Sequence, residues 1–106
     1  MSDATFRLER LASTSGADLA IYTQEAEGTP RGIVHINHGL AEHAGRYARM
    51  AAHLARRGYH VIAQDHRGHG ETQASDGGPR RFADTDGWNK LMQDVAAVHA
   101  EARRRW

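Results

Sequence analysis

Two short polar clusters contain the residue types that can carry chemistry, and each directly follows an apolar run. Residues 38–43 read His-Gly-Leu-Ala-Glu-His, and residues 65–70 read Asp-His-Arg-Gly-His-Gly. Imidazole and carboxylate groups transfer protons or bind metals, and glycine lets the backbone approach a ligand closely. Ligands of parallel sheets bind beyond the carboxyl ends of the strands, so the first cluster lies where chemistry is usually done.

Metal binding is one chemistry that these histidines could perform. The available imidazoles are those of His35, His38 and His43, or those of His66 and His69. Residues 38–43 read H-x-x-x-E-H, which is one residue longer than the H-x-x-E-H pattern that places both histidines on one helical face. We therefore expect no metal ion and no cofactor.

Nucleophilic catalysis by a Ser-His-Asp triad is a second chemistry to consider. The serines are Ser2, Ser13, Ser15 and Ser75, and none of them lies in a G-x-S-x-G sequence. Asp65 and His66 are adjacent, and neighbours in an extended chain point to opposite faces, so they do not form a triad with Ser75. We predict instead that His66 and His69 shape a turn that buttresses the loop at residues 38–43.

The composition is that of one domain. A chain of 106 residues with 40% hydrophobic residues has the usual size and apolar content for a single core. Fourteen Lys and Arg against thirteen Asp and Glu leave a net charge of +1, so charge indicates no nucleic-acid partner. The lack of cysteine excludes disulfides and a cysteine nucleophile, and no segment has the roughly 20 apolar residues of a membrane-spanning helix. We expect a cytoplasmic protein without a transmembrane segment.

A strand and a helix flank the first cluster. The apolar residues of Gly32–Asn37 indicate a strand that is covered on both faces, as in a parallel sheet. After the cluster, apolar residues recur with the spacing of one helical face, at Tyr47, Met50, Ala51, Leu54 and Ala55. Gly58 suits the end of this helix, and residues 59–63 form the next apolar run. The sequence therefore predicts a parallel strand-helix-strand unit.

The rest of the chain predicts a hairpin before this unit and a helix after it. Apolar alternation over residues 6–12 and 19–22, around a turn rich in Ser and Gly, indicates two antiparallel strands. Residues 66–79 contain four glycines and a proline, and they predict a long exposed loop. The last helix should begin near Asp86, as its N-cap. Its predicted apolar stripe is Trp88, Leu91, Met92, Val95, Val98, His99 and Ala102.

Other polar and aromatic residues are expected to have no part in chemistry. We predict that His53 and His60 are exposed or half-buried and that His99 is a satisfied core imidazole. The run of residues 103–105, all arginine, should lie in solvent as a cationic end of the last helix. Trp106 is expected to be exposed.

The two clusters resemble those of the monoacylglycerol lipase and lysophospholipase group of α/β-hydrolases. Residues 38–47 match the pattern HGxxEHxGRY, and residues 65–70, after the helix, match DHxGHG. Two motifs at this separation are specific, and the resemblance covers almost all of the chain. Ala41 stands where the group often has glycine, and Thr72 stands where serine commonly follows the GHG turn.

The resemblance implies a serine hydrolase of carboxylic esters, of the monoacylglycerol or lysophospholipid type, that needs no cofactor. The loop after the third strand would donate a backbone N–H to the oxyanion, and Leu40 would be the donor. Loop-bracing or substrate-proximal positions would be His38, Gly39, Ala41, Glu42, His43 and Arg46. The structural turn would comprise Asp65, His66, Gly68, His69 and Gly70.

The resemblance also implies the fold class, which is α/β. The expected architecture is the N-terminal portion of an α/β-hydrolase sheet, an antiparallel hairpin followed by strand-helix-strand-helix. Residues 1–106 would be a single incomplete segment, since the nucleophile strand and the rest of the triad would belong to a C-terminal partner piece, and the chain alone would be inactive. Its bare strand at residues 32–37 should promote self-association. The alternative hypothesis is a non-catalytic half-fold that binds a partner through this edge.

Overall fold

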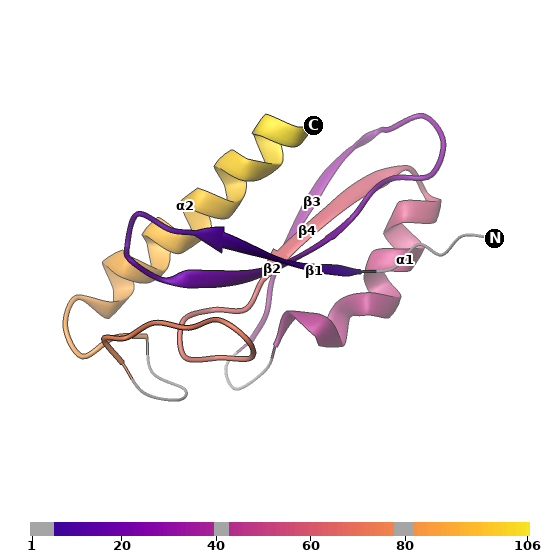
Figure 1. Ribbon diagram of the computed structural model, residues 1–106. Coiled ribbons are helices and arrows are strands. Elements are labelled where there is room, and N and C mark those ends of the chain that lie inside the picture. Colours follow the sequence, from indigo (N-terminus) through magenta and orange to yellow (C-terminus); the bar gives the residue numbers. More distant parts are fainter. Residues whose placement is uncertain (1–5, 40–42, 78–81) are drawn as a thin grey trace.

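The computed structural model describes residues 6–39, 43–77 and 82–106. Its elements form a four-stranded sheet with helices α1 and α2 on either side (Figure 1). In chain order they are β1 (Arg7–Ala12), β2 (Asp18–Gln24), β3 (Gly32–Asn37), the 3-10 helix η1 (Ala44–Tyr47), α1 (Ala48–Arg56), β4 (Tyr59–Gln64) and α2 (Gly87–Arg105). This order confirms the predicted hairpin followed by strand-helix-strand-helix.

The strand order places the ends of β3 and β4 beside each other. The sheet runs β1-β2-β4-β3, in which β1, β2 and β4 pair antiparallel and β3 pairs parallel with β4. Asn37 and Gln64, the last residues of β3 and β4, are register partners. The polar segments that follow these two strands therefore leave the sheet at the same edge.

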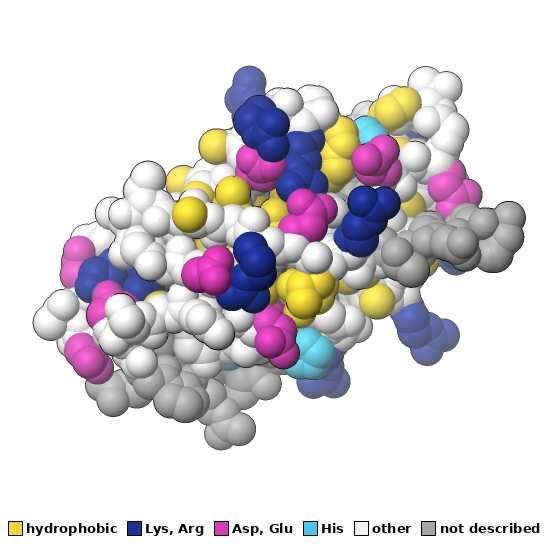
Figure 2. All heavy atoms as spheres, viewed as in Figure 1, with side chains coloured by type: hydrophobic (Ala, Val, Ile, Leu, Met, Phe, Trp, Pro, Cys, Tyr) yellow, Lys and Arg dark blue, Asp and Glu magenta, His cyan; other side chains and the backbone are white. Residues whose placement is uncertain are grey.

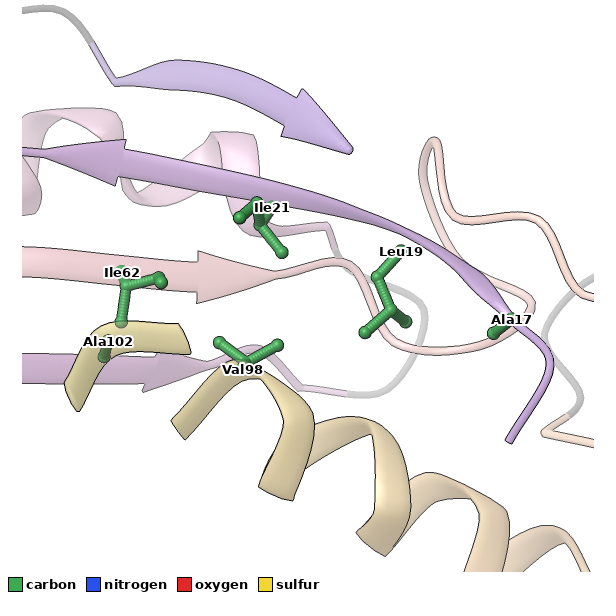
Figure 3. Close-up of a cluster of buried hydrophobic side chains, with 6 residues drawn as sticks. All are labelled: Ala17, Leu19, Ile21, Ile62, Val98 and Ala102. Atoms are coloured by element: carbon green, nitrogen blue, oxygen red, sulfur yellow. The ribbon is translucent and has the colours of Figure 1, made fainter. Parts of the chain in front are cut away.

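Two apolar cores lie on opposite faces of the sheet, because the side chains of each strand alternate between faces. On one face, strand residues pack against the last turns of α2 (Figure 3); this cluster comprises Ala17, Leu19, Ile21, Ile62, Val98 and Ala102. On the α1 face, the buried cluster comprises Ile36, Ala44, Ala51, Val61 and Ala63. Burial on both faces was predicted for β3, and this prediction is wrong: Ile36 is the only buried residue of β3, and Ile33 is 39% exposed, because β3 lies at the edge of the sheet. The strand buried on both faces is β4, whose residues from His60 to Gln64 are all buried.

Helix α1 uses a narrower apolar face than its sequence pattern predicted. It packs on β4 and β2 through the small side chains of Ala51 and Ala55. Met50 was predicted to belong to this face, but it is 50% exposed. Small residues allow the helix to lie close to the sheet, and the longer Met50 side chain stays outside that contact.

Helix α2 begins where it was predicted to begin, but its buried face is rotated. Asp86 precedes the helix in a left-handed conformation, with φ 56°, and its side chain makes no cap hydrogen bond. The buried residues are Leu91, Asp94, Val98 and Ala102. Trp88 and Met92 are 66% and 39% exposed, and His99 is also exposed, so their prediction as core residues is wrong. The stripe is displaced because Asp94 faces inward, where it meets a buried arginine.

The segment after β4 is not the exposed loop that its glycines predicted. Arg67, His69 and Thr72 are buried, and Gln73 forms an antiparallel bridge with Asp18. The prediction was wrong because polar side chains can be buried when they are paired with one another, which composition does not reveal.

The C-terminal residues pack more closely than expected. Arg105 forms an ion pair with Glu9 of β1 at 2.6 Å, and only Arg103 and Arg104 are exposed as predicted. The indole of Trp106 stacks on the buried His60 ring, with centroids 4.5 Å apart and planes 4° apart. The prediction of an exposed Trp106 is therefore wrong, since β4 provides an aromatic surface for it.

The two edge strands of the sheet differ in charge. Strand β1 has Arg7, Glu9 and Arg10, whereas the sequence of β3, GIVHIN, has no acidic or basic residue other than its histidine. On the face shown in Figure 2, acidic and basic side chains are interspersed, and hydrophobic atoms appear in small separate patches. None of the helices in the described ranges is both long enough and apolar enough to cross a bilayer.

Candidate active site

The candidate active site is built where the segments that follow β3 and β4 meet. His38 and Gly39 follow Asn37 in the first segment, and residues 65–70 follow Gln64 in the second. Because the two strands are parallel and in register, these segments leave the sheet side by side. The structure thus brings the two sequence motifs together at the carboxyl end of the sheet.

His38 connects the two segments. Its Nε2 accepts a hydrogen bond from the backbone N–H of His66 at 2.8 Å, and its Nδ1 lies 2.7 Å from the carbonyl oxygen of Gly39. The His38 ring lies 4.2 Å from the ring of His66 and 5.2 Å from the ring of His69, measured between centroids. The His38 side chain is buried, and its two hydrogen bonds connect the turn after β3 to the start of the second segment.

Asp65 is the second buried link between the segments, and its side chain is completely buried. Its Oδ1 accepts the N–H of Ala44 at 2.6 Å, and its Oδ2 accepts the N–H of Glu71 at 2.8 Å and the hydroxyl of Tyr22 at 3.2 Å. Ala44 is the first residue of η1, so the carboxylate supplies an acceptor at a helix N-terminus that lacks a side-chain cap of its own. Burial and the nearby Asp65 charge raise the pKa of Tyr22 to about 12.

The glycines of the second motif allow this carboxylate to be enclosed. Gly68 and Gly70 have φ values of 74° and 51°, in the left-handed region that favours glycine. A Cβ atom at Gly70 would overlap the carboxylate of Asp65. Thr72 completes the turn, because its hydroxyl donates to the Asp65 carbonyl at 2.6 Å and accepts the N–H of Ala20 at 2.9 Å.

A row of polar side chains crosses the ends of β3 and β4 beside this turn. The Nε2 of His35 lies 2.7 Å from Gln64 Oε1, and Gln64 Nε2 donates to Asn37 Oδ1 at 2.7 Å. Burial lowers the pKa of His35, and it lowers the pKa of His66 to about 4, with a smaller effect from the neighbouring histidines. Both rings are therefore neutral at pH 7. Sequence reasoning missed Gln64, although a glutamine that ends an apolar strand was a signal for it.

Arg67 anchors the second segment to the rest of the chain, and sequence reasoning missed it. Its guanidinium is 1% exposed; it donates to the Phe82 carbonyl at 2.8 Å and to Ser15 Oγ at 2.7 Å, and it pairs with Asp76. Asp94 of α2 lies 3.7 Å from the same guanidinium. The available signal was Asp94 itself, an acidic residue that shares a helix face with the apolar Leu91 and Val98.

The other predicted site residues divide into two groups. Leu40, Ala41 and Glu42 lie outside the described residues. His43 and Arg46 are described and exposed, on either side of the start of η1. The structure therefore gathers His38 and Gly39 with the second motif, and it leaves His43 and Arg46 at the surface.

A small cavity of about 130 Å³ adjoins Gly39. It is lined by His38, Gly39, His66, His69, Phe82 and Leu91. The Nδ1 of His69 lies 2.9 Å from the Arg67 carbonyl, and its Nε2 is buried without a hydrogen-bond partner.

The side chains of this site are suited to holding a backbone turn in place. Among the described residues, no group of three or more His, Cys, Asp or Glu side chains could hold a metal ion. The hydroxyls of Ser13 and Ser15 both donate to Asp94.

Comparisons with known proteins agree with this architecture. The family model for serine aminopeptidase, S33, matches residues 28–106. The chain is 38% identical over 72 residues to a monoacylglycerol lipase of Mycolicibacterium smegmatis, over 68% of this chain and 26% of the lipase. It is 35% identical over 66 residues to the monoglyceride lipase of Homo sapiens, over 62% of this chain and 22% of that enzyme.

A solved structure extends the comparison to the whole sheet. A thermostable carboxyl esterase from Bacillus coagulans superposes with a TM-score of 0.76 and 24% identity, over 98% of this chain and 33% of the esterase. At this identity the similarity shows the fold alone. The chain spans about a quarter of the length of the lipases it matches. It belongs to the serine aminopeptidase S33 family, and its sheet is the N-terminal portion of an α/β-hydrolase fold.

Proposed function

We propose that this chain is the oxyanion-binding segment of a serine hydrolase that acts on carboxylic esters. The proposed substrates are monoacylglycerols or lysophospholipids, and the first are supported by the similar proteins named above, which are lipases of monoacylglycerols. In this proposal the serine, aspartate and histidine of the triad belong to a C-terminal part of the hydrolase. The segment alone is then inactive toward esters.

One observation carries the proposal, which is the hydrogen bond between His38 and the carbonyl of Gly39. A trans peptide group points its N–H opposite to its C=O. Because the Gly39 carbonyl is directed toward His38, we propose that the N–H of Leu40 is directed away from it, toward the substrate. An amide held in this way stabilises the alkoxide that forms when a nucleophile attacks the ester, by about 2.7–4 kcal/mol for one donor.

The rigidity of the turn supports this role. An oxyanion donor is effective only if it is already oriented before the negative charge develops. The two segments share links through His38 and Asp65, both of which are buried. Gly39 leaves room for the ester carbonyl because it has no side chain.

Complementation tests the proposal. The chain is mixed with a C-terminal hydrolase piece that carries G-x-S-x-G, assembly is checked by size-exclusion chromatography, and cleavage of a p-nitrophenyl ester is measured. Leu40→Pro removes the proposed N–H donor, whereas Leu40→Ala keeps it. We expect kcat of the assembled Leu40→Pro complex to fall by about 10²–10³, with Leu40→Ala close to the unchanged chain. Equal activity of the two assembled variants would contradict the proposal.

A second candidate function is a non-catalytic module that binds a partner through the edge of β3. The uncharged sequence of this strand favours it, because exposed edge strands usually carry charges that prevent pairing. The same edge supports our proposal that the isolated chain self-associates. A stable complex with the C-terminal piece that never hydrolyses esters would favour the binding module. For the isolated chain, cooperative unfolding as a monomer at high protein concentration would refute self-association.

A further inference from the structure

His38 makes two hydrogen bonds whose polarity is fixed by its partners. The backbone N–H of His66, 2.8 Å from Nε2, can only donate, and the carbonyl of Gly39, 2.7 Å from Nδ1, can only accept. Nε2 must therefore present its lone pair, and Nδ1 must carry the proton. The contacts admit a single form of the ring, the neutral Nδ1–H tautomer.

The surroundings of His38 preserve this form. The side chain is 5% exposed, so it exchanges its hydrogen bonds poorly with water. The rings of His66 and His69 lie against it, with centroids at 4.2 Å and 5.2 Å. Rotation of the ring by 180° about its χ2 bond would direct both nitrogens away from their partners and break both hydrogen bonds, which costs about 0.5–1.5 kcal/mol for each bond.

We propose that His38 is a positioning residue. Its two ring nitrogens tie the oxyanion turn after β3 to the backbone that follows β4, so the position of β4 determines the position of the turn. Nε2 accepts the N–H of His66, two residues after the end of β4, and Nδ1–H donates to the carbonyl of Gly39 and so fixes its direction. This inference rests on the proposed function only for its consequence in catalysis. The role of His38 as a link between two backbone groups stands independently of it.

Isotopic labelling of the histidines tests the tautomer directly in the unchanged chain. In long-range ¹⁵N–¹H correlation spectra at neutral pH, Nδ1 of His38 should show the shift of a protonated nitrogen and Nε2 that of an unprotonated one. A spectrum of the Nε2–H tautomer, or of a doubly protonated ring, would overturn the proposal. This measurement requires no substitution, so it decides the question even if the variants below fail to fold.

Two substitutions separate the functions of the two nitrogens. His38→Asn keeps an amide donor near the position of Nδ1, and His38→Gln keeps an oxygen acceptor near the position of Nε2. We expect hydrogen exchange at the His66 amide to be about tenfold faster in His38→Asn than in His38→Gln, because only the second retains the acceptor. The carbonyl ¹³C resonance of Gly39 should move in His38→Gln and stay in place in His38→Asn.

A matched control uses the exposed His53 of α1. His53→Asn and His53→Gln should leave the His66 amide and the Gly39 carbonyl unchanged. If both variants of His38 alter the two signals equally, His38 only fills space and the proposal is wrong. A correct NMR result together with no ester hydrolysis after complementation would reject the proposed function and leave the positioning role of His38 standing.

Discussion

The buried carboxylate of Asp65 offers the sharpest test of how the site is held together. Asp65→Asn preserves the shape of the side chain but replaces one carboxylate oxygen with an NH₂ group. In the structure, Oδ1 accepts the N–H of Ala44, and Oδ2 accepts the N–H of Glu71 and the hydroxyl of Tyr22. All three partners donate, so an NH₂ group in either orientation meets at least one backbone donor.

The magnitude follows from the bonds that are lost. A hydrogen bond to a charged group contributes about 1.5–3 kcal/mol, and a buried donor left unpaired costs about 1–3 kcal/mol more. Asp65 is 0% exposed, so water does not compensate for the lost acceptor. We expect Asp65→Asn to lower the free energy of unfolding by about 3–5 kcal/mol, which is a large share of the 5–15 kcal/mol typical of a domain.

Urea unfolding, followed by far-UV circular dichroism, measures this difference. The control is Asp18→Asn, because Asp18 is an aspartate that pairs with Arg10 at 3.0 Å but is 54% exposed. Exposed ion pairs contribute about 0–1 kcal/mol, so this variant should be nearly as stable as the unchanged chain. If Asp65→Asn costs no more than Asp18→Asn at equal m values, the carboxylate does not link the segments as described.

Four further predictions concern other polar groups that are buried or half-buried. Arg67→Met should cost about 3–5 kcal/mol in urea unfolding, because it leaves the buried charge of Asp94 uncompensated, and adding Asp94→Leu should recover much of that loss; an additive double variant would refute the coupling. Gln24→Met should stabilise the chain by about 1–3 kcal/mol, because both polar atoms of the buried Gln24 amide lack partners; a lower urea midpoint would contradict this. Burial raises the pKa of Tyr22 to about 12, so its contribution to stability is complete below pH 10 and is lost as the pH rises through 12; absorbance at 295 nm should show one late-titrating tyrosine that Tyr22→Phe removes. Burial lowers the pKa of His66 to about 4, so its contribution is complete above pH 6.5 and is lost as the pH falls toward 4; thermal melts of His66→Gln should show a flatter pH dependence over this range.

The sheet and its order of elements could be predicted because each depends on local patterns. Apolar runs and their spacing specify β3, β4 and α1, and Gly58 marks a turn through its positive φ of 96°. The pairing of β3 with β4 follows from the short helical connection between them. These features need no knowledge of contacts between distant residues, so the sequence was sufficient for them.

The burial of the second segment could not be predicted, because its partners are far away in the sequence. Arg67 meets Ser15, which is 52 residues away, and α2 supplies Asp94. A run of glycines and polar residues has the same composition whether it is exposed or internally paired. The rotation of α2 had the same origin, because Asp94 is buried only where Arg67 compensates its charge.

Three consecutive residues after β4 explain how one turn organises most of the fold. Asp65 holds the start of η1 through Ala44, His66 offers its backbone N–H to His38, and Arg67 reaches toward α2. Successive residues in an extended segment point in different directions, so a single short stretch can contact three elements. Displacing α2 or the hairpin would therefore move the same backbone that holds His38. The position of the turn after β3 therefore depends on packing on both faces of the sheet. We expect substitutions in either core to shift this turn even when the substituted residue does not contact it.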